Sequence, residues 1–113
     1  MNVNAIGSAN VLDALRHLNK KVVAVMITSD KAYDNVEWIW GYRENDELGG
    51  ADPYSASKAA VEKVFEGFYQ SFLKTNKKIG AVTTRAGNVI GGGDLSADRI
   101  IPDCIRALRN NER

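Results

Sequence analysis

The sequence has few of the features that mark secreted, membrane or nucleic-acid-binding proteins. Its single cysteine, Cys104, excludes an internal disulfide and favours a reducing compartment. No apolar run approaches the ~20 residues of a membrane-spanning helix, and the N-terminus lacks the basic and apolar regions of a signal peptide. The formal net charge is +1, from 15 basic and 14 acidic residues, so neither nucleic acid nor a membrane is expected as a partner. These absences predict a cytoplasmic protein.

The glycine-rich turn by which many α/β proteins bind a dinucleotide is also missing. That fingerprint is GxGxxG directly after a strand, with an acidic residue about 20 positions further on. The nearest glycine run, residues 91–93, follows the last predicted strand and has a different spacing. We therefore expect this chain to bind a dinucleotide weakly or not at all by itself.

Apolar periodicity predicts an alternation of helices and strands. Residues 4–18 and 54–73 carry apolar stripes at helical spacing, and a last helix is predicted to begin at Pro102. Residues 22–28 and 79–85 are runs of strand length, rich in apolar and β-branched side chains. The order helix, strand, helix, strand, helix predicts an α/β fold with parallel strands.

Several local features complete the predicted layout. The first strand does not alternate, so we expect it to be covered on both faces, and two strands alone make a poor sheet. Residues 34–52 contain two tryptophans and three glycines and predict a long ordered loop. Cys104 lies on an apolar stripe and is predicted to be in the core, whereas His17 is predicted to face solvent.

The first predicted strand ends in the polar residues Thr28, Ser29, Asp30 and Lys31. In open α/β folds, ligands bind outside the carboxyl ends of the strands, so the loops that leave them carry the chemistry. A hydroxyl, a carboxylate and an amine in succession therefore form a candidate site for proton transfer. The alternative is a solvated turn.

A second candidate lies at the start of the second helix, where Asp52 is a good N-cap and Pro53 is tolerated at the first helical position. Tyr54 and Lys58 follow at positions i and i+4, which share one helix face. An ammonium beside a phenol favours the phenolate, which takes a proton from an alcohol. Tyrosine and lysine at this spacing also occur by chance in many helices.

The YxxxK pair, preceded by a strand that ends in a hydroxyl residue, resembles the short-chain dehydrogenases/reductases. The stretch from Asn4 to Leu12 is similar to a helix of their extended branch, which acts on nucleotide sugars. Within that branch, the segments SDKAYDN, EWIWGYREND, DPYSASK and RAGNVIGGGD resemble the CDP-glucose 4,6-dehydratases. This resemblance implies a partial Rossmann-like, doubly wound parallel sheet, an NAD cofactor and a nucleotide-sugar substrate, CDP-glucose.

The resemblance also implies roles for the residues of the oxidation step. Tyr54 matches the base for the sugar 4-hydroxyl. Lys58 matches the residue that tunes this tyrosine and holds the nicotinamide ribose. Ser29 matches the hydroxyl that bonds the 4-oxygen, and Thr28 is expected to contact the cofactor.

The remaining roles concern elimination and substrate binding. Asp30 and Lys31 match the pair that removes the C5 proton and delivers a proton to the leaving 6-hydroxyl. Asn88 lies where the family contacts the substrate, and Arg99 where an arginine meets the diphosphate. Leu95 departs from the family pattern, in which a tryptophan is expected after GGGD.

The resemblance implies that residues 1–113 are the catalytic middle of such an enzyme, without its N-terminal dinucleotide-binding half and its C-terminal substrate region. Two alternatives remain: an inactive fragment that acts at most as an assembly module, and another epimerase or dehydratase of the same family. Because the apolar stripes and strand edges are uncovered, we also expect a homodimer or a higher oligomer.

Overall fold

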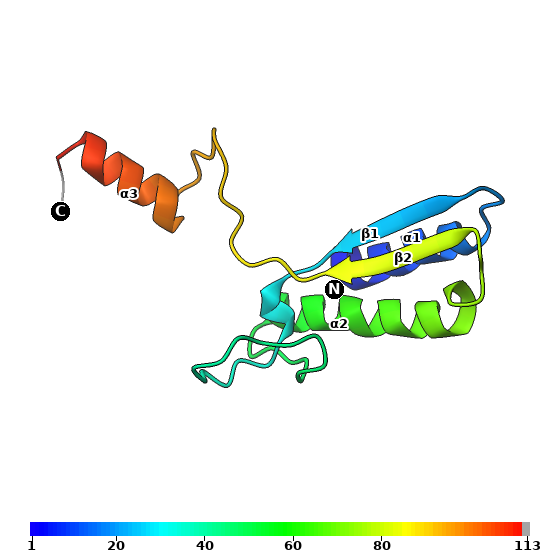
Figure 1. Cartoon of the computed structure of the whole chain (residues 1–113). Coiled ribbons are helices and arrows are strands. Elements are labelled where there is room, and N and C mark those ends of the chain that lie inside the picture. Colours follow the sequence, from blue (N-terminus) through cyan, green and yellow to red (C-terminus); the bar gives the residue numbers. More distant parts are fainter. Residues whose placement is uncertain (112–113) are drawn as a thin grey trace.

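The computed structural model describes residues 1–111 and contains one two-stranded parallel sheet with helices packed against it (Figure 1). Strand β1 (Val22–Ile27) pairs with β2 (Ile79–Thr84), in a register that places Val22 opposite Ile79. Helices α1 (Gly7–Arg16) and α2 (Pro53–Phe68) pack against each other and the sheet. The predicted α/β class and parallel pairing are confirmed.

The two packed helices extend beyond their regular α-helical parts. A π-helical turn over Asn2–Ile6 precedes α1, and a second one over Tyr69–Leu73 continues α2 to the predicted end. The start of α2 follows the predicted capping. The Asp52 carboxylate accepts hydrogen bonds from the backbone N–H groups of Tyr54, at 2.8 Å, and Ser55, at 3.0 Å.

The core lies between the helices and one face of the sheet. Its buried members are Leu12, Leu15, Leu73 and Ile79. On β1 only every second residue faces this core, and on the opposite face Val23 is 77% exposed and Ile27 74%. The prediction that β1 is covered on both faces was therefore wrong for this chain, because the helices that pack on the sheet cover the face of Val22 and Ala24.

Helix α3 (Ile100–Arg109) stands apart at the end of an extended arm that leaves β2 (Figure 1). The radius of gyration is 17.7 Å, against the ~13 Å of a compact domain of this size. Cys104 is exposed, so its predicted place in the core was wrong: the apolar stripe of α3 has no sheet beneath it. The helix begins at Ile100 and not at Pro102. His17 is exposed, as predicted.

Across residues 1–111, no helix is both long and apolar enough to cross a membrane.

Candidate active site

A cavity of about 480 Å³ opens at the carboxyl ends of the two parallel strands. The end of β1, the start of α2, the segment after β2 and the residue before α3 all contribute to it. Seven of the eight predicted site residues line this cavity, and Lys58 lies behind them on α2. The complete lining is Ile27, Thr28, Ser29, Asp30, Lys31, Tyr54, Ala86, Gly87, Asn88, Val89 and Arg99.

The polar residues after β1 form a 3₁₀ turn, Asp30–Ala32, that is capped by Ser29. The Ser29 hydroxyl oxygen accepts from the Lys31 backbone N–H at 3.2 Å and lies 3.1 Å from Asp30 Oδ1. The Asp30 backbone N–H donates to the Ala86 carbonyl at 3.0 Å, which joins this turn to the segment after β2. Ser29 is buried, while Asp30 and Lys31 are exposed. The segment is a turn whose charged side chains line a cavity.

The first turns of α2 bring Tyr54 and Lys58 together. Lys58 Nζ lies 5.7 Å from the centroid of the Tyr54 ring, the shared face expected from the i, i+4 spacing. Tyr54 is 53% exposed, so a ligand in the cavity can reach it. Hydrogen bonds from the Ser55 hydroxyl and the Ser55 and Tyr54 backbone hold the pKa of Asp52 below its usual range. This cap stays ionised at neutral pH and fixes the turn that presents Tyr54.

Asn88 and Arg99 lie on the arm between β2 and α3. Both are exposed, and Arg99 is the residue that precedes the first turn of α3. The structure therefore brings the two predicted substrate contacts to the same cavity as the predicted catalytic residues.

Thr28 lines the cavity, but its hydroxyl bonds to the protein interior. It donates to Glu62 Oε1 and lies 3.1 Å from the Thr84 carbonyl oxygen. The expected contact between Thr28 and the cofactor stays a prediction, and this hydroxyl already has partners within the chain.

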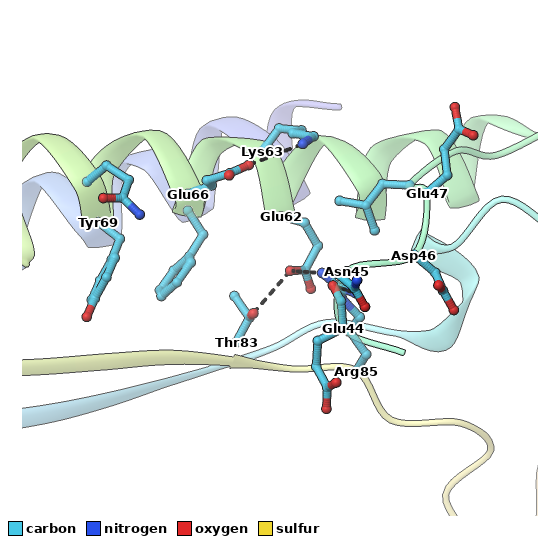
Figure 2. A pocket seen from close by; sticks show the side chains of 13 residues that line it. Glu44, Asn45, Asp46, Glu47, Glu62, Lys63, Glu66, Tyr69, Thr83 and Arg85 are labelled. Atoms are coloured by element: carbon cyan, nitrogen blue, oxygen red, sulfur yellow. Dashed lines mark hydrogen bonds and ion pairs between the residues drawn. The ribbon is translucent and has the colours of Figure 1, made fainter. Parts of the chain in front are cut away.

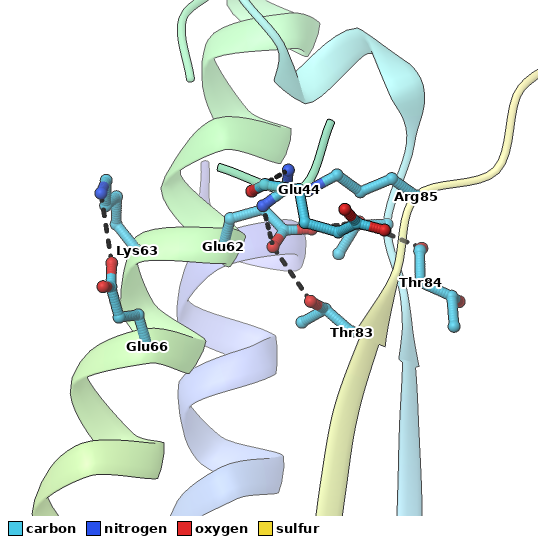
Figure 3. A network of polar contacts seen from close by, with 8 residues as sticks. Glu44, Glu62, Lys63, Glu66, Thr83, Thr84 and Arg85 are labelled. Atoms are coloured by element: carbon cyan, nitrogen blue, oxygen red, sulfur yellow. Dashed lines mark hydrogen bonds and ion pairs between the residues drawn. The ribbon is translucent and has the colours of Figure 1, made fainter. Parts of the chain in front are cut away.

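The sequence reasoning missed a charged pair, the buried Glu62 and the partly buried Arg85 (Figure 3), which connects to this site through the Thr28 hydroxyl. Glu62 is 4% exposed, and its Oε2 accepts from Arg85 Nη2 at 3.1 Å and from the Thr83 hydroxyl at 3.0 Å. We call Thr28, Glu62, Thr83 and Arg85 the Glu62 network. The signal in the sequence is weak: Glu62 follows Ala59, Ala60 and Val61, but Lys63 comes next, and such a glutamate is ordinarily interpreted as facing solvent.

Burial and hydrogen bonding shift the pKa values of Glu62 and Arg85 in opposite directions. Burial by itself would raise the pKa of Glu62, but hydrogen bonds from Arg85 and Thr28 outweigh it and lower that pKa. Burial likewise works to lower the pKa of Arg85, and its bonds to Glu62 prevail and raise it. Both groups are therefore charged at neutral pH, and each compensates the desolvation of the other.

The predicted long loop between η2 (Asp30–Ala32) and α2 is folded back against the start of α2. Tyr33 stacks on Tyr42 with ring centroids 4.9 Å apart, and the Arg85 guanidinium lies 4.7 Å from the Tyr33 ring centroid. A Cβ atom on Gly50 would lie 2.5 Å from the Ala56 backbone nitrogen. Glycine is thus required where the loop meets the helix.

A second cavity, of about 660 Å³, lies between α2 and residues 44–48, and Glu62 is among the residues that line it (Figure 2). Acidic side chains surround it, and Thr83 and Arg85 belong to its lining. None of the eight predicted site residues lines it. The residues singled out in the sequence therefore converge on the cavity at the strand ends and not on this one.

Comparisons with known proteins give the family. CDP-glucose 4,6-dehydratase of Salmonella typhimurium is 46% identical over 97% of this chain, which spans 32% of that protein. The dTDP-D-glucose 4,6-dehydratase of Dictyostelium discoideum is 29% identical over 97% of this chain and 26% of its own length. The chain thus spans about a third or less of these relatives.

Among solved structures, a Burkholderia cenocepacia J2315 protein proposed to be an epimerase superposes with a TM-score of 0.77 at 24% identity, over 97% of this chain and 34% of that one. This likeness shows the fold and agrees with the predicted partial Rossmann-like sheet. Residues 1–113 match the NAD dependent epimerase/dehydratase family. Because this match covers the whole sequence and agrees with the motifs, the chain belongs to the NAD dependent epimerase/dehydratase family.

Proposed function

We propose that this chain is the catalytic middle of a CDP-glucose 4,6-dehydratase-like enzyme. The observation that carries the proposal is the convergence of the strand-end residues Ser29, Asp30 and Lys31 with Tyr54 on one cavity. The 46% identity to a CDP-glucose 4,6-dehydratase supports this choice of substrate within the family.

The first step is oxidation of the sugar at C4. Tyr54, with Lys58 beside it, removes the proton of the 4-hydroxyl, and Ser29 orients the 4-oxygen. Bound NAD would supply the hydride chemistry, both for the oxidation at C4 and for the later reduction at C6. Tyr54 and Lys58 fit the nicotinamide end, since the phenol opens to the cavity and the ammonium lies 5.7 Å from its ring centroid. No residues of this chain are proposed for the pyrophosphate.

The second step is loss of water across C5 and C6. The ketone at C4 makes the C5 proton acidic. Asp30 and Lys31 share its removal and the protonation of the departing 6-hydroxyl, which leaves as water. Return of the hydride to C6 and of a proton to C5 then gives a 4-keto-6-deoxy sugar. The overall reaction converts CDP-glucose to this product and one molecule of water, without net consumption of NAD.

The remaining contacts bind the nucleotide sugar. Arg99 at the cavity rim provides a guanidinium suited to the two acidic phosphates of the substrate. Asn88, on the same arm, provides an amide that can donate to and accept from sugar hydroxyls.

A segment exchange tests the proposal. Residues 1–113 would replace the matching third of the Salmonella CDP-glucose 4,6-dehydratase, and purified chimera would be supplied with NAD and CDP-glucose. We expect the 4-keto-6-deoxy product, identified by mass spectrometry, and the unmodified relative serves as the reference. A folded chimera that binds NAD but forms no product would overturn the proposal.

The same experiment separates the two alternatives. An epimerase would invert C4 and release no water, so its product would keep the mass of CDP-glucose. The Asp30–Lys31 pair favours the dehydratase, because epimerisation through C4 has no water to eliminate. If the segment serves assembly alone, the chimera would form its oligomer without turnover.

A further inference from the structure

The geometry points to Glu62 and Arg85 as positioning residues that hold the two halves of the candidate site at a fixed separation. One half is the Ser29–Lys31 turn after β1, and the other is Tyr54 with Lys58 on α2. Neither Glu62 nor Arg85 lines the cavity at the strand ends, so neither is assigned to the chemistry. The inference rests on the proposed function for the chemical roles of the site residues. The contacts from which it is argued do not depend on that function.

The Glu62 carboxylate bonds to both strands from the helix that carries Tyr54. Oε1 accepts from the Thr28 hydroxyl at the end of β1, and Oε2 accepts from the Thr83 hydroxyl on β2 at 3.0 Å (Figure 3). Glu62 follows Lys58 by one helical turn and shares its face of α2. A single buried side chain therefore sets the position of α2 relative to both strand ends.

Arg85 extends the same constraint to the loop. Its Nη2 donates to Glu62 at 3.1 Å, its Nη1 donates to the Glu44 carbonyl at 3.0 Å, and its guanidinium covers the Tyr33 ring. Tyr33 directly follows the 3₁₀ turn, and Thr28 directly precedes Ser29. The Glu62 network thus holds the catalytic turn at both of its ends.

Hydrogen exchange of the 113-residue chain tests this without any assay of activity. Glu62→Gln keeps the shape of the side chain and removes its charge. We expect amides in residues 29–34 and 44–49 to exchange about tenfold faster or more, while those of α1 keep their protection. The matched control is Glu66→Gln, which removes the carboxylate of the exposed Lys63–Glu66 pair on the same helix.

The exchange result decides the inference in either direction. Equal exchange at residues 29–34 in Glu62→Gln and Glu66→Gln would overturn it. If Glu62→Gln does not fold, Thr28→Val replaces it, because this change removes one hydroxyl donor and leaves the ion pair intact. Unchanged exchange at residues 29–34 in Thr28→Val would then overturn the inference.

Turnover of the chimera separates positioning from stability and from cofactor binding. Thr28→Val deletes the hydroxyl bond between Glu62 and the residue that precedes the Ser29–Lys31 turn, and Glu66→Gln on the same helix again serves as the control. We expect kcat to fall about tenfold in Thr28→Val with KM for NAD unchanged, and to stay near its original value in Glu66→Gln. A raised KM for NAD in Thr28→Val, or equal losses of kcat in both variants, would refute the positioning role.

The two proposals fail separately. An inactive chimera with altered exchange in Glu62→Gln would refute the proposed function alone. An active chimera with unaltered exchange would refute the positioning inference alone.

Discussion

The contact between the long loop and α2 yields the sharpest stability prediction, because one substitution at two glycines should give opposite signs. At Gly50 an added Cβ atom would lie 2.5 Å from the Ala56 nitrogen, 2.6 Å from the Ser55 carbonyl carbon and 2.7 Å from Ser55 Cβ. Two of these three atoms belong to the backbone of the first turn of α2 and cannot rotate away. At Gly67, also on α2, an added Cβ atom would meet no heavy atom of a neighbouring segment within 4 Å.

The magnitudes follow from these distances. Non-bonded carbon atoms pack at about 3.5–4.0 Å, so Gly50→Ala requires the loop and helix to separate by roughly 1 Å. Overpacking of this kind costs about 1–3 kcal/mol of unfolding free energy. Gly67→Ala fills open space in a helix, where alanine is favoured over glycine by about 0.5–1 kcal/mol. The two variants should therefore differ by about 1.5–4 kcal/mol.

Urea unfolding followed by far-ultraviolet circular dichroism measures both free energies. We expect the transition midpoint to fall for Gly50→Ala and to rise for Gly67→Ala, with equal slopes. A Gly50→Ala midpoint at or above that of the original chain would refute the packing of the loop on α2. A lowered midpoint for Gly67→Ala would show that the helix face around residue 67 is occupied.

Four further predictions concern the site and its assembly. In the chimera, Tyr54→Phe and Lys58→Met should abolish product formation while the melting temperature changes little, because neither side chain belongs to the buried core. Near-original rates would contradict their roles. Lys31→Ala should still reduce NAD when CDP-glucose is added but stall product release, as followed by nicotinamide absorbance, and loss of the absorbance change would assign Lys31 to binding instead. Glu62 has a lowered pKa in the folded state, so the stability that its charged form contributes is present above the usual glutamate pKa of ~4.3 and is lost as pH falls through the folded value. The difference in unfolding free energy between the original chain and Glu62→Gln should therefore shrink in acid. A difference that stays constant with pH would contradict the charged pair. Sedimentation at micromolar concentration should show at least a dimer, since Val23, Val25 and Ile27 leave an apolar sheet face exposed, and a well-folded 12.4 kDa monomer would contradict this expectation.

The parts of the site that follow from local rules were predictable from the sequence. Asp52 and Pro53 mark the start of α2, and the i, i+4 spacing then places Tyr54 and Lys58 on one face. The polar residues from Ser29 follow a strand, and the ends of parallel strands meet at one edge of a sheet. These rules place the groups of each motif, and the shared edge of the parallel strands brings the motifs to one cavity.

The exposed apolar surfaces were harder to predict. An apolar stripe shows which face of an element favours burial, but it does not show which segment packs on that face. From such apolar patterns, β1 was predicted to be covered on both faces and Cys104 was predicted to lie in the core. In β1 one apolar face is covered and the other is exposed. In α3 the stripe carrying Ile105 and Leu108 is exposed along with Cys104.

The Glu62 network shows why the distance between the Ser29–Lys31 turn and Tyr54 could not be predicted from the sequence. Each motif specifies its own local geometry, but the proposed proton transfer requires Tyr54 and the Ser29–Lys31 turn to meet one sugar at fixed distances. That distance depends on a carboxylate whose partners lie 34, 21 and 23 residues away in the chain. No spacing rule joins such partners, and an isolated glutamate on a helix is ordinarily interpreted as a solvent-facing charge. The burial of Glu62 next to Val61 is explained by its ion pair with Arg85, which directly follows β2 and compensates the charge. The motifs therefore specify which groups are proposed to react, and in our inference a long-range ion pair outside those motifs sets the distance between them.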